Sequence, residues 1–180
     1  MAGAKKTIDL AKTEAVKSEF MLPLVLTKVV VAQVRAGDSA AAAASAESIS
    51  DPENKAMIYE AIAQAQIDAG DLSAAKSNAA KLKGTRYEMD LNLGFAEAQA
   101  KAHDSAGATK NLDDAKATAA KIDVPLLQSF ATARIAASQT RCGDIPGAIQ
   151  YAHSLKNPEP RASALCAIVQ TLSRESAKHP

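Results

Sequence analysis

Tryptophan is absent from this sequence, and aromatic residues make up only 3% of it. Because β-strands favour aromatic and β-branched side chains, this scarcity argues against a sheet. Alanine is instead the commonest residue, and its high helix propensity favours helices that pack closely through small side chains. The chain of 180 residues is long enough to bury a core of its own. The composition therefore predicts an all-α protein.

The sequence also lacks an excess of one charge, a cysteine framework and a long apolar run. Its 21 basic and 20 acidic residues give a net charge of +1, so no overall field would draw it to nucleic acid or to an anionic membrane. Two cysteines, Cys142 and Cys166, do not make the disulfide framework of a small secreted domain. The run LPLVLTKVVVAQV is interrupted by Lys28 and is too short to span a bilayer. We expect a cytoplasmic protein, or an exported one if a signal peptide has been removed.

A helix–turn–helix pattern recurs along the chain. The stretch EAIAQAQIDAGDLSAAKSNAAKL reads as two apolar, alanine-rich helices joined at Gly70-Asp71. Related stretches are joined at Gly37-Asp38, His103-Asp104 and Gly143-Asp144, so that successive hinges are 33, 33 and 40 residues apart. Repetition at this period predicts stacked helical units rather than one closed core.

The residues at each hinge suit the end of one helix and the start of the next. Glycine adopts the left-handed conformation that ends a helix at little steric cost, and His103 does so less easily. The aspartate that follows is expected to cap the next helix through its side-chain oxygen. Prolines are expected to separate the units by starting new helices, at positions 52, 125, 158 and 160, and Gly84-Thr85 separates the second unit from the third.

Further positions match between the second and fourth units. They are Ile62, Ala63, Gly70, Asp71 and Ala75 in the second unit and Ile135, Ala136, Gly143, Asp144, Ala148 and Pro160 in the fourth. This pattern resembles the tetratricopeptide family of helix–turn–helix repeats from about Pro23 to the C-terminus. The family's aromatic positions are mostly Ala or Gln here, and one of its tyrosine positions is taken by Gln33, Gln66, Gln99 and Gln139. Their recurrence indicates a shared packing or hydrogen-bonding role, facing either inward or toward a ligand.

The resemblance implies a right-handed α-solenoid of antiparallel helix pairs. Its units would span residues 23–51, 52–84, 85–123, 124–157 and, in part, 158–180, after an N-terminal helix within residues 1–22 at about Thr7 to Phe20. In this family the first helices of successive units line a concave groove that holds peptides. The corresponding lining here would include Val31, Arg35, Gln64, Ile67, Glu97, Lys101, Phe130, Ala137, Arg141, Gln170 and Arg174.

One register of this lining is mostly basic, with the residues Arg35, Asp68, Lys101, Arg141 and Arg174. Such a row would form a basic edge that takes an acidic peptide. Each cation also lies in the last turn of its predicted helix, where it would complement the helix dipole without any ligand. Both interpretations remain open at this point.

The 40-residue interval contains seven residues more than the others. They would lengthen the second helix of the third unit by about two turns. The result would be either a protruding helix that exposes Asp113 and Asp114 for docking, or a neutral insertion of the kind that solenoids tolerate.

The sequence offers little for catalysis. His103, His153 and His179 form no helical metal-binding pair, and no phosphate loop or nucleophile elbow is present. Cys142 and Cys166 are expected to be buried free thiols, too far apart for a disulfide. We therefore expect no catalytic residues, no metal, no cofactor and no enzymatic activity. The resemblance implies a scaffold that binds a protein or peptide in its groove, and the alternative is a structural protein that stacks on copies of itself through its ends.

Overall fold

The computed structural model of the protein describes residues 7, 10, 13, 22–85 and 87–177. Within these residues all regular secondary structure is helical and there is no strand, which confirms the all-α prediction. The chain divides into two compact units, Met1–Tyr87 and Glu88–Pro180, and each is described by itself. The predicted N-terminal helix from Thr7 to Phe20 falls largely outside the described residues.

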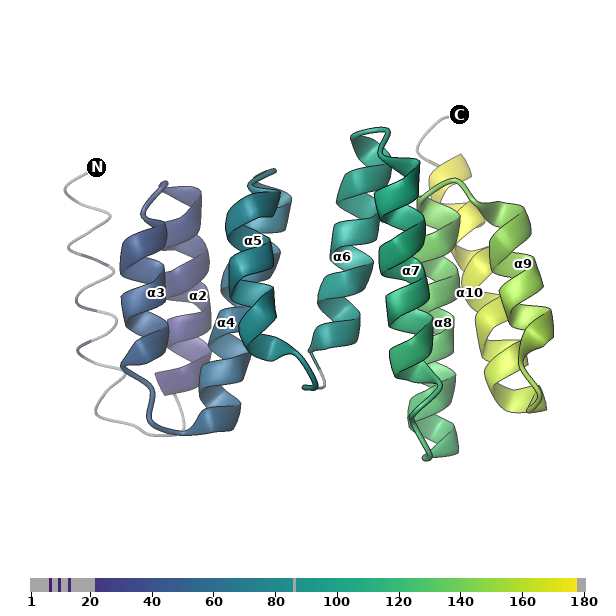
Figure 1. The fold of residues 1–180 in the computed structure, drawn as a ribbon, viewed down its shortest axis with the longest axis horizontal. Coiled ribbons are helices and arrows are strands. Elements are labelled where there is room, and N and C mark those ends of the chain that lie inside the picture. Colours follow the sequence, from purple (N-terminus) through teal and green to yellow (C-terminus); the bar gives the residue numbers. More distant parts are fainter. Residues whose placement is uncertain (1–6, 8–9, 11–12, 14–21, 86, 178–180) are drawn as a thin grey trace. The chain divides into compact units, whose positions relative to one another are not determined.

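Between residues 22 and 85 the first unit contains four α-helices and a short 3-10 helix. They are α2 (Leu22–Arg35), α3 (Ser39–Glu47), α4 (Pro52–Asp68), α5 (Leu72–Ala79) and η1 (Ala80–Leu82). Helix α2 packs against α3 and α4, and α4 packs against α5 (Figure 1). The core of this unit is made of completely buried aliphatic side chains, among them Val30, Ala42, Ile58, Ile62 and Ala75.

The described residues of the second unit, 88–177, form five α-helices. They are α6 (Glu88–Lys101), α7 (Ser105–Ala119), α8 (Pro125–Arg141), α9 (Ile145–Ser154) and α10 (Pro158–Ser176). Helix α8 contacts all four others, and most extensively α10, which lies beside it (Figure 1). Two neighbouring residues of α8 serve two hydrophobic clusters. Ile135 packs with α6 and α7, and Ala136 packs with α9 and α10. Prolines begin α4, α8 and α10, as their positions in the sequence predicted.

The four predicted hinges share one hydrogen-bonded turn. Gly37, Gly70, His103 and Gly143 have φ angles of +80°, +82°, +60° and +86°. At the second hinge the Gly70 amide donates to the Ile67 carbonyl over 3.0 Å, and the Asp71 amide donates to the Gln66 carbonyl over 2.9 Å. The other three hinges repeat both bonds. This is the Schellman arrangement, which satisfies carbonyls at the end of the first helix.

Each hinge aspartate also caps the helix that follows. The Asp71 carboxylate accepts a hydrogen bond from the Ala74 amide over 3.0 Å, and Asp38, Asp104 and Asp144 do the same for the residue three positions later. The predicted combination of a left-handed turn and an aspartate cap is therefore confirmed at all four hinges.

The recurring glutamines are buried, and in the first three pairs they tie the first helix to the second. The exposed fractions of the four glutamines lie between 2% and 7%. The Gln66 side-chain oxygen accepts from Asn78 Nδ2 over 2.9 Å, the Gln99 oxygen accepts from Asn111, and the Gln33 oxygen accepts from the Ser45 hydroxyl over 3.2 Å. The register thus has an inward, hydrogen-bonding role, which is one of the two roles that the sequence left open.

In the second unit the glutamine also reaches the cap aspartate. Gln99 Nε2 donates to Asp104 Oδ2 over 2.9 Å, and Gln139 Nε2 donates to Asp144 Oδ2 over 2.6 Å. Glycine at the third position after each aspartate makes room for this contact. A Cβ atom on Gly107 would lie 2.0 Å from Gln99 Nε2, and one on Gly147 would lie 2.4 Å from Gln139 Nε2. In the first unit these positions are Ala41 and Ala74, and no bond from Gln33 or Gln66 to a cap aspartate forms among the described residues.

We predict that His103→Gly stabilises the second unit by about 0.5–1 kcal/mol. The left-handed conformation destabilises a residue that has a Cβ atom by about 1–2 kcal/mol. Glycine removes this strain, and its greater freedom in the unfolded chain offsets only part of the stabilisation. Urea unfolding followed by circular dichroism measures the difference. Gly143→Ala is the converse control, because open space surrounds that position and only the backbone conformation changes. Equal or lower stability of His103→Gly would refute the expectation.

We predict that Asp144→Ala destabilises the protein by about 2–4 kcal/mol, the sum of a lost helix cap and a buried Gln139 amide left without its partner. Asp144→Ser is the matched control, because serine retains the cap but is too short to reach Gln139. The serine variant is expected to recover about 1 kcal/mol of the loss. Urea midpoints of the two variants test this, and equal stability would show that the cap contributes nothing here.

Candidate functional site

In the first unit the predicted lining residues lie on α2 and α4, which pack together. Arg35 is exposed and Val31 is half-buried. Gln64 is half-buried and donates to Asp68 Oδ1 over 2.9 Å, so the acidic member of the predicted basic row already has a partner. Ile67 has only 6% of its surface exposed and contributes to the core.

In the second unit the predicted lining residues lie on α6, α8 and α10, and α8 packs against both other helices. Lys101, Gln170 and Arg174 are exposed, and Ala137 is half-buried. Phe130 is the most conspicuous member, since 61% of this large apolar residue is exposed. The residues Phe130, Ala137 and Arg141 recur at helical spacing and share one face of α8.

Two ion pairs join α6 to α8. Arg141 Nη2 lies 2.6 Å from Glu97 Oε1, and Arg134 Nη1 lies 2.6 Å from Asp90 Oδ1. Both pairs join residues 44 positions apart, and they are two helical turns from each other. The hydrogen bond to Glu97 raises the pKa of Arg141 above its usual value. Two predicted lining residues, Glu97 and Arg141, therefore neutralise each other, and the basic row is weaker in the second unit than the sequence suggested.

Large apolar side chains gather where α8 begins. They are Val124, Leu126, Leu127 and Phe130, whose exposed fractions are 52%, 65%, 54% and 61%. We call these four residues the α8 patch. Only Phe130 among them was predicted from the sequence. The spacing of apolar residues could have identified two others, because Leu126 and Leu127 precede Phe130 by four and three residues and so lie on neighbouring parts of the helix surface.

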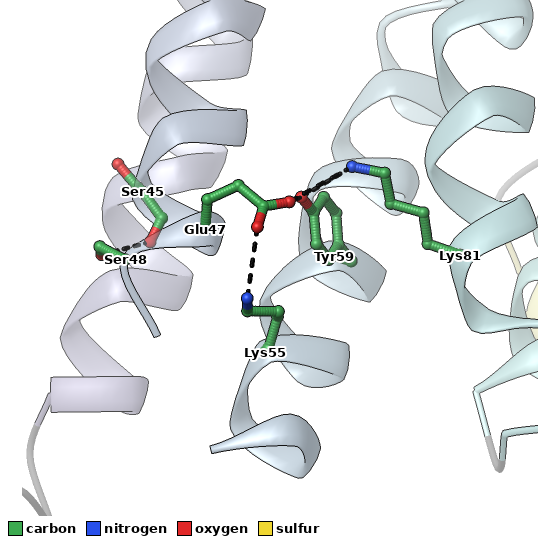
Figure 2. Close-up of polar contacts among 6 residues, drawn as sticks. All are labelled: Ser45, Glu47, Ser48, Lys55, Tyr59 and Lys81. Atoms are coloured by element: carbon green, nitrogen blue, oxygen red, sulfur yellow. Dashed lines mark hydrogen bonds and ion pairs between the residues drawn. The ribbon is translucent and has the colours of Figure 1, made fainter. Parts of the chain in front are cut away.

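A polar cluster in the first unit joins α3, α4 and η1. Figure 2 shows the Glu47 carboxylate directed toward Lys55, Tyr59 and Lys81. Tyr59 donates its hydroxyl hydrogen to Glu47 and accepts a hydrogen bond from Lys81 Nζ over 2.7 Å. Lys55 Nζ lies 3.3 Å from Glu47 Oε2. The bond from Tyr59, followed by that from Lys55, lowers the pKa of Glu47.

This cluster holds the end of α3 against α4 and the segment after α5. Tyr59 is almost fully buried, with 3% exposed, and the Lys81 ammonium lies 3.9 Å from the centre of its ring. The positions do not recur in the repeat, since Asn92 stands 33 residues after Tyr59. The repeat pattern therefore does not predict the cluster. Its contacts are those of a structural clamp.

The two cysteines are free, but only one is partly buried. The expectation of two buried thiols is wrong for Cys166, which is exposed on α10. Cys142 is half-buried at the end of α8, and burial raises the pKa of its thiol to about 11. His153 is exposed on α9. Among the described residues no group of three His, Cys, Asp or Glu side chains is placed to hold a metal ion.

The seven extra residues lengthen α7, as predicted. Helix α7 has 15 residues, whereas α3, α5 and α9 have 9, 8 and 10. Asp113 and Asp114 are exposed, and each has a lysine neighbour. Lys116 Nζ lies 3.3 Å from Asp113 Oδ1, and Lys110 Nζ lies 2.6 Å from Asp114 Oδ2. No helix in the described part of the chain is long and apolar enough to cross a membrane.

We predict that Cys166 reacts with a thiol reagent at least about tenfold faster than Cys142 at pH 8, where only about one Cys142 thiol in a thousand is ionised. Because its pKa is raised, the Cys142 rate should rise about tenfold with each pH unit until the pH nears that pKa. Maleimide labelling of Cys142→Ser and Cys166→Ser isolates each thiol. Similar rates for the two variants would contradict the burial of Cys142.

The chain was compared with protein-family models, curated proteins and solved structures, and no match was found among any of them. The residues and contacts described above are therefore the basis for proposing a function.

Proposed function

We propose that the protein is a non-catalytic scaffold that binds a segment of another protein on the face formed by its first helices. In this proposal the four hinged helix pairs form a tetratricopeptide-like solenoid. The shared hinge turns and the buried glutamines support it, because each pair joins its two helices by the same backbone turn and the same aspartate cap.

The α8 patch is the observation that carries the proposal. Single exposed apolar residues are common on proteins, but four large ones within seven residues concentrate exposed apolar area at one end of α8. The protein buries such side chains elsewhere, as Phe95 with 4% exposed shows. Aromatic and aliphatic side chains grouped in this way are typical of the centre of a protein interface.

The charges along α8 favour an amphipathic partner segment. Leu126 and Phe130 are followed on the same helix face by Ala137 and then Arg141, whose guanidinium is paired with Glu97. The helices α6 and α10, which pack against α8, carry the exposed cations Lys101 and Arg174. A segment with large apolar side chains at one end and carboxylates at the other would match this order.

Stacking of copies remains the second candidate function. The observation in its favour is Val169 on α10, which is 63% exposed, together with Ile149 on α9, which is 40% exposed. These residues lie on the last two helices that the structure describes. Burial of that end by another copy would remove both from water.

We predict that the double variant Leu126→Ser, Phe130→Ser captures at least about tenfold less of its partner than the wild type in a pull-down from the source organism's lysate. Apolar side chains at the centre of an interface contribute about 2 kcal/mol or more each. The matched control is Ile149→Ser, which removes an exposed apolar side chain outside the α8 patch. Quantitative mass spectrometry measures the partner, and circular dichroism checks that each variant keeps its helices.

Capture that survives the double variant would contradict the proposed binding face. Sedimentation velocity over a range of concentrations distinguishes the stacking alternative. Assembly of the wild type that Val169→Ser abolishes and the double variant leaves intact would favour the structural protein over the scaffold.

A further inference from the structure

A cavity of about 640 Å³ lies within the second unit. It is open to solvent on one side and lined by the end of α7, the first half of α8, the end of α9 and the segment that leads into α10. Its volume falls within the range of about 300–1,000 Å³ that is common for small-molecule sites. The cavity is formed by residues other than the predicted lining residues and the α8 patch.

The lengthened helix α7 builds one wall of this cavity. Lys116, Ala119 and Ala120 line it. Helix α9 ends ten residues after its cap aspartate. In α7 all three lining residues lie more than ten positions after the corresponding cap aspartate, Asp104. A third unit with an interval of 33 residues would lack this wall. The insertion therefore has a structural consequence that neither sequence interpretation included.

The lining is basic and rich in hydrogen-bond donors. Lys116 and Lys156 are the two basic residues of the lining, and no acidic residue lies among the lining residues. Tyr151, Gln128 and Asn157 add a hydroxyl and two amides. A cavity with two cations and no acid favours an anion.

The two lysines are not needed to satisfy the helix ends nearby. At the end of α9 the Arg161 guanidinium donates to the Leu155 carbonyl over 2.7 Å and to the Lys156 carbonyl over 3.2 Å. At the end of α7 the carbonyls of Lys116 and Ala119 accept backbone amides. The Lys116 pair with Asp113 involves a carboxylate side chain that is 64% exposed, and such a surface pair contributes little energy.

The rest of the lining is apolar or neutral. Ala119 and Pro160 are buried, and Leu155 is half-buried. The buried Thr132 directs its hydroxyl to the Ser129 and Pro160 carbonyls. Burial raises the pKa of Tyr151 to about 12, so its hydroxyl remains a neutral donor at pH 7. Lys116 Nζ lies 5.4 Å from the centre of the Tyr151 ring, which places positive charge beside an aromatic face.

The geometry points to a binding site for a small organic anion, a carboxylic acid with an apolar or aromatic body. Its carboxylate binds the Lys116 and Lys156 ammonium groups, and its body packs on the Tyr151 ring, Leu155 and Ala120. This site is independent of the proposed partner-binding face. It would give the protein a ligand-binding function in addition to a scaffold function.

The test uses three aryl acids, phenylacetate, 3-phenylpropionate and 2-naphthoate, each beside its uncharged carboxamide. Amide chemical shifts of the isotope-labelled full chain are followed by NMR at low salt. We expect at least one acid to cause saturable shifts at residues 116–120 and 151–157, with an affinity at least about tenfold above that of its carboxamide, as expected for a charge-assisted contact.

The double variant Lys116→Gln, Lys156→Gln should weaken binding of that acid by about tenfold or more. The matched control, Lys110→Gln with Lys121→Gln, makes the same change of net charge at exposed lysines of the second unit that neither line the cavity nor belong to the proposed partner-binding face. It should leave the affinity unchanged. The inference is overturned if no acid gives saturable shifts at these residues, if the carboxamides bind equally well, or if both double variants lose affinity alike.

Discussion

The turn between the first and second helix of each pair is the constraint on which the rest of the structure depends. One residue, the glutamine, serves it twice. Its backbone carbonyl accepts the aspartate amide that completes the turn, and in three of the four pairs its buried side chain also reaches the second helix. Because the aspartate then caps that second helix, the end of one helix, the start of the next and the contact between them depend on a few neighbouring residues. An alanine-rich sequence with few large side chains needs this polar fixing, since small side chains alone specify helix positions poorly.

The sequence allowed the hinges to be predicted because they depend on local chemistry. Left-handed glycine, a capping aspartate and prolines at helix starts act within a few residues, so their spacing was sufficient to place the helices. The role of the glutamines was harder to predict. Whether the amide reaches the cap aspartate depends on glycine or alanine at the third position after it, a steric effect that appears only once both helices are in place. The exception at Tyr151, which stands where the second and third pairs have Asn78 and Asn111, leaves Gln139 Oε1 without a partner among the described residues.

Contacts between residues far apart in sequence were missed for a related reason. Glu47, Tyr59 and Lys81 belong to three different helices and occupy positions that the repeat does not preserve. The basic row was predicted by register alone, and register does not show that Glu97 on a neighbouring helix would neutralise Arg141. Cys166 was expected to be buried because free cysteines are among the most buried residue types, but it is exposed on α10. In each case the missing information was which residues of other helices lie nearby, and spacing along the sequence does not contain it.

The α8 patch on its own would bind a partner only weakly. Burial of the still-exposed parts of the four α8 patch residues would contribute about 4–8 kcal/mol. Association of two proteins costs about 4–15 kcal/mol in lost freedom of motion, so the patch alone would give weak binding at best. A partner must therefore extend beyond the patch, toward the half-buried Ala137 and the exposed cations Lys101 and Arg174. The charges then decide the orientation of the segment while the apolar patch supplies most of the affinity. A scaffold of this kind would exchange partners readily, because losing any one part of an extended contact leaves too little free energy to keep the complex together.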